Sequence, residues 1–196
     1  MSAFGDAFLY HLRTNLDAFL TTIADVPADD LNTWKPTMTT EGDEATNTFA
    51  ALGVHIVGAG EFMTLIAVDH APVTRDREAE FHATATHDEL KTRFESWLVK
   101  LQRQLERLTE AELAARNTHD RYIDRNWTNA QVMLHALDHT ALHVGHAEIQ
   151  KQLWLDEQAH DAATDDHRAP RRQQLRPGFP EKPMRITDKE AKRTLA

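Results

Sequence analysis

The chain has 196 residues, of which 41% are hydrophobic, a size and composition that suit one domain with a real core. Cysteine is absent, which excludes disulfides, thiolate metal sites and cysteine nucleophiles. The formal net charge of −9 argues against nucleic acid as a partner, because phosphate binding requires a basic face.

The first two predicted helices cover residues 3–24 and 48–69, where apolar side chains recur at helical spacing. A proline and two aspartates interrupt the pattern after the first helix. The second helix contains Gly53, Gly58 and Gly60, each of which weakens a helix by ~1 kcal/mol relative to alanine. Small residues inside a helix allow a neighbour to approach closely, and we expect packing to offset this cost.

The third predicted helix begins at a capping box formed by Thr86 and Glu89 and continues to about residue 108. Its charged residues lie mostly on the face opposite the apolar positions, as in an amphipathic surface helix. The connection before this helix, residues 71–85, is long for a loop within a helical bundle.

The fourth predicted helix repeats the capping pattern with Thr128 and Gln131 and runs over residues 129–155. Residues 160–168 are expected either to add a short helix or to fray. The remainder of the chain contains four prolines and little periodicity, which indicates an extended tail.

No segment alternates between apolar and polar residues with period two, so strands are not expected. Four amphipathic helices predict an all-α, up-and-down four-helix bundle. We expect one bundle domain over residues 1–168, followed by a Pro-rich C-terminal tail over residues 169–196.

Four of the twelve histidines lie on one stripe of the fourth helix. His135, His139, His143 and His146 fall within about 80° of one another at 100° per residue. His139 and His143 are one turn apart, ~6 Å by helical rise, so their rings can converge on one ion. We expect His135 and His146 to orient the ligands rather than to bind the metal.

A third ligand must come from another helix, and His55 is the best candidate because it lies within the apolar pattern of the second helix. A buried histidine needs a polar partner or a metal to offset its desolvation, and a hydrogen bond alone would also satisfy it. Three histidines and a water would form an open site, as in catalytic zinc centres. The other histidines are interpreted as surface residues: His11, His70, His82, His87, His119, His160 and His167.

Three pieces of the sequence resemble the DinB superfamily of metal-binding four-helix proteins. They are the segment Leu52-Gly53-Val54-His55 followed by Glu61-Phe62, the spaced histidines from His135 to His146 with Gly145, and Trp34-Lys35-Pro36 in the first loop. The resemblance covers about residues 3–155. It implies a DinB-type bundle with metal ligands at His55, His139 and His143, and it favours a homodimer.

The DinB superfamily includes thiol S-transferases and isomerases that use bacillithiol or mycothiol. The resemblance therefore implies a metal-dependent thiol S-transferase in which a divalent transition metal, Zn, Ni or Fe, stabilises the thiolate of a low-molecular-weight thiol cosubstrate. Three alternatives stay open: a metal-dependent hydrolase, a non-catalytic stress protein that binds a metal or small ligand, and a structural bundle with vestigial histidines. The residues indicate no second catalytic group.

The expected partner is a small-molecule substrate, without a nucleic acid or a membrane. No apolar stretch reaches the ~20 residues that cross a bilayer. The N-terminal residues carry Asp6 and His11 within their apolar pattern, which is not typical of a signal peptide. We therefore expect a cytoplasmic protein.

Overall fold

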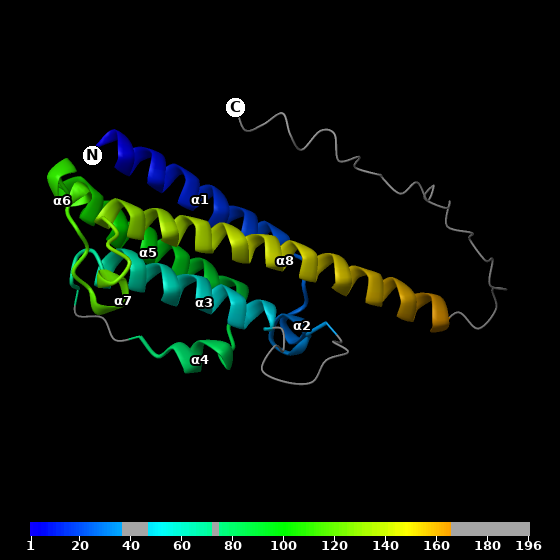
Figure 1. Cartoon of the computed structure of the whole chain (residues 1–196). Coiled ribbons are helices and arrows are strands. Elements are labelled where there is room, and N and C mark those ends of the chain that lie inside the picture. Colours follow the sequence, from blue (N-terminus) through cyan, green and yellow to red (C-terminus); the bar gives the residue numbers. More distant parts are fainter. Residues whose placement is uncertain (37–46, 72–74, 166–196) are drawn as a thin grey trace, which may run out of the picture.

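The fold is all-α in a computed structural model of the chain, which describes residues 1–36, 47–71 and 75–165 (Figure 1). The four long helices are α1 (Ala3–Ile23), α3 (Phe49–Glu61), α5 (His87–Arg107) and α8 (Asn129–Asp165). The shorter elements are α2 (Ala28–Thr33), the π-helical turn η1 (Phe62–Ile66), α4 (Arg77–Phe81), α6 (Glu110–Ala114) and α7 (Asp120–Ile123). The prediction of an all-α protein is confirmed.

The long helices surround one hydrophobic core. Helix α1 packs against α5 and α8, and α3 packs against the same two helices. Side chains from all four meet in the interior, including Leu12, Ile56, Trp97 and Ala136, each with no exposed surface. Burial of these apolar groups is the main driving force that holds the helices together.

Helices α3 and α5 run parallel, so the long helices do not alternate in direction as the predicted up-and-down bundle requires. Residues further along α3 contact residues further along α5: Gly53 lies against Leu90, and Gly60 lies against Trp97. The Lys100 Nζ atom then pairs with Glu61 Oε1 at 2.8 Å. The long connection before α5 accounts for this arrangement, because it returns the chain to the end of the bundle where α3 began.

Both predicted capping patterns are present. The Thr86 hydroxyl accepts from the backbone N–H of Glu89 at 3.2 Å, and a Glu89 carboxylate oxygen accepts from the Thr86 N–H at 2.8 Å. Thr128 and Gln131 form the same reciprocal pair at the start of α8, at 3.3 and 2.8 Å. These bonds satisfy backbone donors that a helix N-terminus otherwise leaves unpaired.

The helix ends differ from the prediction in two places. The regular α-helix of the second segment ends at Glu61, and η1 follows, closed by a bond from the Ala67 N–H to the Phe62 carbonyl at 2.9 Å. Helix α8 continues to Asp165, past the predicted end at residue 155. Residues 166–196 lie outside the described residues, so the predicted tail and the domain boundary at residue 168 stay predictions.

The glycines of α3 admit close neighbours, as expected. A Cβ atom added at Gly53 would lie 2.9 Å from Leu90 Cδ2, and one added at Gly60 would lie 2.1 Å from the Trp97 ring. At Gly58 it would lie 2.1 Å from a carboxylate oxygen of Glu80. Each glycine therefore leaves a space that a side chain from another segment occupies.

The stretch Phe49–Ile66 is long and apolar enough to cross a membrane by composition alone, which we did not expect. Its mean hydropathy is 1.6, and 78% of it is buried within the described fold. The place of α3 among the other long helices therefore accounts for its apolar composition.

Candidate metal centre

Three histidines from two helices meet in the bundle, and they are the three expected as metal ligands. His55 projects from α3, and His139 and His143 project from α8, one turn apart. The ring centroid of His55 lies 5.2 Å from that of His139 and 5.0 Å from that of His143. One nitrogen from each ring lies within 4.8 Å of the others, so the group could hold a metal ion.

The spacing of these nitrogens fits a tetrahedral metal. Zinc–nitrogen bonds of ~2.0–2.1 Å place two ligand nitrogens ~3.3 Å apart at a tetrahedral centre. The Nε2 atoms of His139 and His143 are 3.2 Å apart. An all-imidazole donor set is compatible with several transition metals, including zinc, nickel and iron.

A buried carboxylate orients the third ring. Glu80 is 6% exposed, and its Oε2 atom lies 2.8 Å from Nδ1 of His55. Arg75 donates two hydrogen bonds to the same carboxylate: from Nε to Oε1 at 2.6 Å and from Nη2 to Oε2 at 2.7 Å. Because a carboxylate only accepts hydrogen bonds, His55 donates through Nδ1, and the lone pair on Nε2 remains for a metal.

Glu80 and Arg75 were missed by sequence reasoning, because they belong to the connection that was interpreted as a long loop. The local pattern does not separate Glu80 from Glu78, whose side chain is 82% exposed. The only available signal was Gly58, one turn after His55, where the absence of a side chain leaves room for the carboxylate.

The rings of the centre are held neutral by their burial. Burial, followed by the neighbouring His143 and His55 rings, lowers the pKa of His139 to about 3. Burial, with His55 and His146 nearby, lowers the pKa of His143 to about 4. Burial also lowers the pKa of His55, and this outweighs the opposing hydrogen bond to Glu80. Neutral imidazole is the form that binds metals.

One nitrogen of the centre lacks a partner. Nδ1 of His139 is buried and makes no hydrogen bond within the described part of the chain. A buried polar atom without a partner costs free energy, and such atoms in native proteins call for an explanation such as an ion or a functional role. It is not the Nε2 atom that faces His143, so a metal held between the two Nε2 atoms would not satisfy it.

The two remaining histidines of the stripe lie on opposite sides of the centre. The His146 ring is exposed, and its Nδ1 atom is 3.3 Å from Nδ1 of His143. The His135 ring lies edge-on to Trp127, with centroids 5.3 Å apart, and its centroid is 6.5 Å from that of His139. His146 therefore contacts a candidate ligand, whereas His135 packs among aromatic rings.

The histidines predicted to lie on the surface divide into three groups. His11, His70, His82 and His160 are exposed. His87 and His119 are half-buried: the His87 Nε2 atom lies 2.9 Å from the Ile23 carbonyl oxygen, and His119 caps α7. His167 lies outside the described residues.

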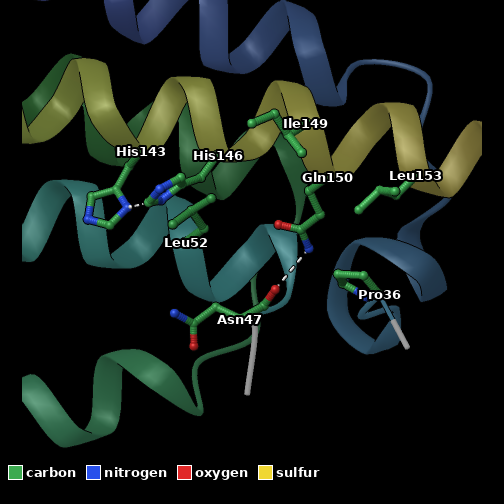
Figure 2. Close-up of a pocket in the computed structure, with 8 residues that line it drawn as sticks. All are labelled: Pro36, Asn47, Leu52, His143, His146, Ile149, Gln150 and Leu153. Atoms are coloured by element: carbon green, nitrogen blue, oxygen red, sulfur yellow. Dashed lines mark hydrogen bonds between the residues drawn. The ribbon is translucent and has the colours of Figure 1, made fainter. Parts of the chain in front are cut away.

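An apolar groove of about 450 Å³ opens beside the centre (Figure 2). His143 and His146 lie at one end of the groove, and Leu153 and Pro36 lie at the other. Gln150 also lines the groove, and its side-chain amide donates to the Asn47 carbonyl at 2.8 Å. A ligand in this groove would therefore reach His143 directly.

Comparison with known proteins identifies the family. The family model of the DinB superfamily matches residues 11–147, which contain His55, His139 and His143. The crystal structure of a conserved protein from Enterococcus faecalis aligns with a TM-score of 0.60 at 16% identity, covering 78% of this chain and 97% of that chain, and this likeness shows the fold alone. The comparison with curated proteins yields no match. The chain belongs to the DinB superfamily.

Proposed function

We propose that this protein binds one divalent transition metal through His55, His139 and His143 and uses it to transfer a low-molecular-weight thiol to a small-molecule substrate. The observation that carries the proposal is the convergence of three imidazoles whose candidate ligand nitrogens lie within 4.8 Å of one another. Membership of the DinB superfamily supports it, because the resemblance implies a relation to thiol S-transferases. We propose Zn, Ni or Fe as the metal, because imidazole suits each of them.

The residues of the centre each have a role in this proposal. When bound, the metal would supply a cation that favours the thiolate over the thiol. His139 and His143 present neutral nitrogens at a separation of 3.2 Å. Glu80 and Arg75 hold His55 in the tautomer that leaves Nε2 available. The three protein ligands leave a coordination position open, as in catalytic zinc sites.

The chemistry around the centre favours thiol transfer over hydrolysis. Metal-dependent hydrolases commonly place a carboxylate base beside the metal-bound water. Both oxygens of Glu80 are engaged by Arg75 and His55. Among the described residues, no carboxylate lines the apolar groove. A sulfur nucleophile needs no such base once it is a thiolate.

The sulfur must arrive with a cosubstrate, because the chain contains no cysteine. We propose bacillithiol or mycothiol, the cosubstrates that the family resemblance implies. The apolar groove beside His143 suits a substrate with an apolar body, which would lie next to the open position of the centre.

Metal analysis of the purified full chain tests the proposed site. The wild-type protein is expected to hold about one equivalent of metal, and His139→Ala and His143→Ala are expected to hold almost none. His11→Ala, a matched change at an exposed helical position, is expected to keep the full equivalent. Variants of His139 and His143 that retain stoichiometric metal would show that the site is wrong.

A second experiment tests the reaction. Conjugation of bacillithiol or mycothiol to an electrophilic substrate is expected with the metal-loaded protein and is expected to stop after chelation. Hydrolysis of simple esters or amides without any thiol conjugation would instead identify a metal-dependent hydrolase. The absence of both activities in a protein that binds metal would favour a non-catalytic binding function.

A further inference from the structure

A small cavity of about 90 Å³ lies beside His55 and His139, toward the start of α8. Three arginines line it: Arg75, Arg77 and Arg121. No carboxylate lines the cavity in the described part of the chain. A cavity of this size has room for one small polar group.

Two of the three arginines at this cavity have no ion-pair partner among the described residues. The chain as a whole carries a net charge of −9, yet three guanidinium groups gather here. Arg75 is paired with Glu80, whose second contact is His55. Within the ranges that the structure describes, neither Arg77 nor Arg121 forms an ion pair.

Aromatic rings support the two unpaired guanidinium groups. Arg77 lies 4.9 Å from the centroid of Phe81, and Arg121 lies 5.5 Å from the centroid of Phe62. Stacking of this kind uses the flat face of the guanidinium and leaves its N–H donors free at the edge. These donors match the oxygens of a carboxylate or a phosphate.

We infer that this cavity is a subsite for an oxyanion, a carboxylate or phosphate group carried by the small-molecule substrate. The role of this anion as part of a substrate beside a metal rests on the proposed function. The arginine-lined cavity itself does not depend on a metal. Arg77 and Arg121 line the cavity and form no ion pair within the described ranges, so an anion bound here would offset their charge. The substrate would place its acidic group here and its apolar part in the groove beside His143.

An NMR titration of the full chain with sodium acetate and with inorganic phosphate tests this subsite. The ionic strength is held constant with chloride, and the Nε–H signals of the arginines are followed in metal-free and zinc-loaded protein. Arg77→Gln combined with Arg121→Gln is expected to weaken binding of the preferred oxyanion about ten-fold or more. Arg103→Gln removes the same charge from an exposed position of α5 and is expected to change nothing.

The outcomes separate the two proposals. Binding that depends on Arg77 and Arg121 but not on zinc supports the subsite, even if zinc itself does not bind and the proposed metal site fails. If the double variant binds the oxyanion as tightly as the wild type does in the zinc-loaded form, the subsite is overturned and the metal site stays intact. The subsite is also overturned if neither probe binds in either form, or if Arg103→Gln weakens binding as much as the double variant. Preference for acetate or for phosphate identifies the acidic group of the substrate.

Discussion

The space over Gly58 determines where the Glu80 carboxylate lies, and Gly58→Ala tests whether that placement supports the metal centre. The added Cβ would lie 2.1 Å from Oε1 of Glu80, so the carboxylate must move away from His55 and Arg75. Alanine gains ~1 kcal/mol of helix propensity over glycine, whereas separating a buried charged pair costs ~3 kcal/mol or more. The net loss in the free energy of unfolding is therefore about 2 kcal/mol or more.

Gly58→Ala is also expected to weaken metal binding about 10- to 100-fold, which is the usual effect of removing the partner of a ligating histidine. Gly145→Ala is the matched control, because it lies in α8 and a Cβ there would meet no atom within 4 Å. That variant is expected to gain ~0.5–1 kcal/mol of stability and to bind metal as the wild type does.

Two measurements on the same samples test this reasoning. Urea denaturation in the presence of a chelator gives the stability of the metal-free protein, and competition with a coloured zinc indicator gives the metal affinity. If Gly58→Ala is as stable as Gly145→Ala and binds zinc equally well, Glu80 does not position His55 and the reasoning is refuted.

Two further predictions concern stability. Gly60→Ala places a Cβ atom 2.1 Å from the buried Trp97 ring, so we expect the free energy of unfolding to fall by about 1–3 kcal/mol. Urea denaturation measures this loss, and a stability equal to the wild type would contradict this packing. The metal-free protein is expected to lose stability as the pH falls below ~6.5, because histidines in the unfolded chain take up protons there while the folded pKa values of His139 and His143 are about 3 and about 4. Between its unfolded and folded pKa, each of the two histidines contributes up to ~1.4 kcal/mol per pH unit to the slope of the free energy of unfolding against pH. His143→Gln should therefore show a shallower pH dependence than the wild type. Equal slopes would show that the His143 ring is not buried in its neutral form.

The helices and the pair of histidines on α8 could be predicted because local rules govern them. The capping patterns at Thr86 and Thr128 depend on residues three apart, and both form as expected. The separation of His139 and His143 follows from the helical repeat, so any helix over these residues brings their rings together. These features need no information about the rest of the chain.

The partners of His55 could not be predicted in the same way. Glu80 is 25 residues from His55 in the chain, and only the course of the connection between α3 and α5 brings the two side chains together. That connection also makes α3 and α5 parallel, a direction that the apolar periodicity of each helix does not contain. The same connection supplies Arg75 and Arg77 to the small cavity.

The sequence by itself determined which residues form the long helices and that His139 and His143 share one face, because hydrogen bonding and side-chain projection within a helix repeat every few residues. The tertiary structure decided that His55 meets that face, that Glu80 and Arg75 orient its ring, and that the centre lies between an apolar groove and an arginine-lined cavity. The physical reason is that these contacts join segments far apart in the chain, so they depend on how the helices pack rather than on any local pattern.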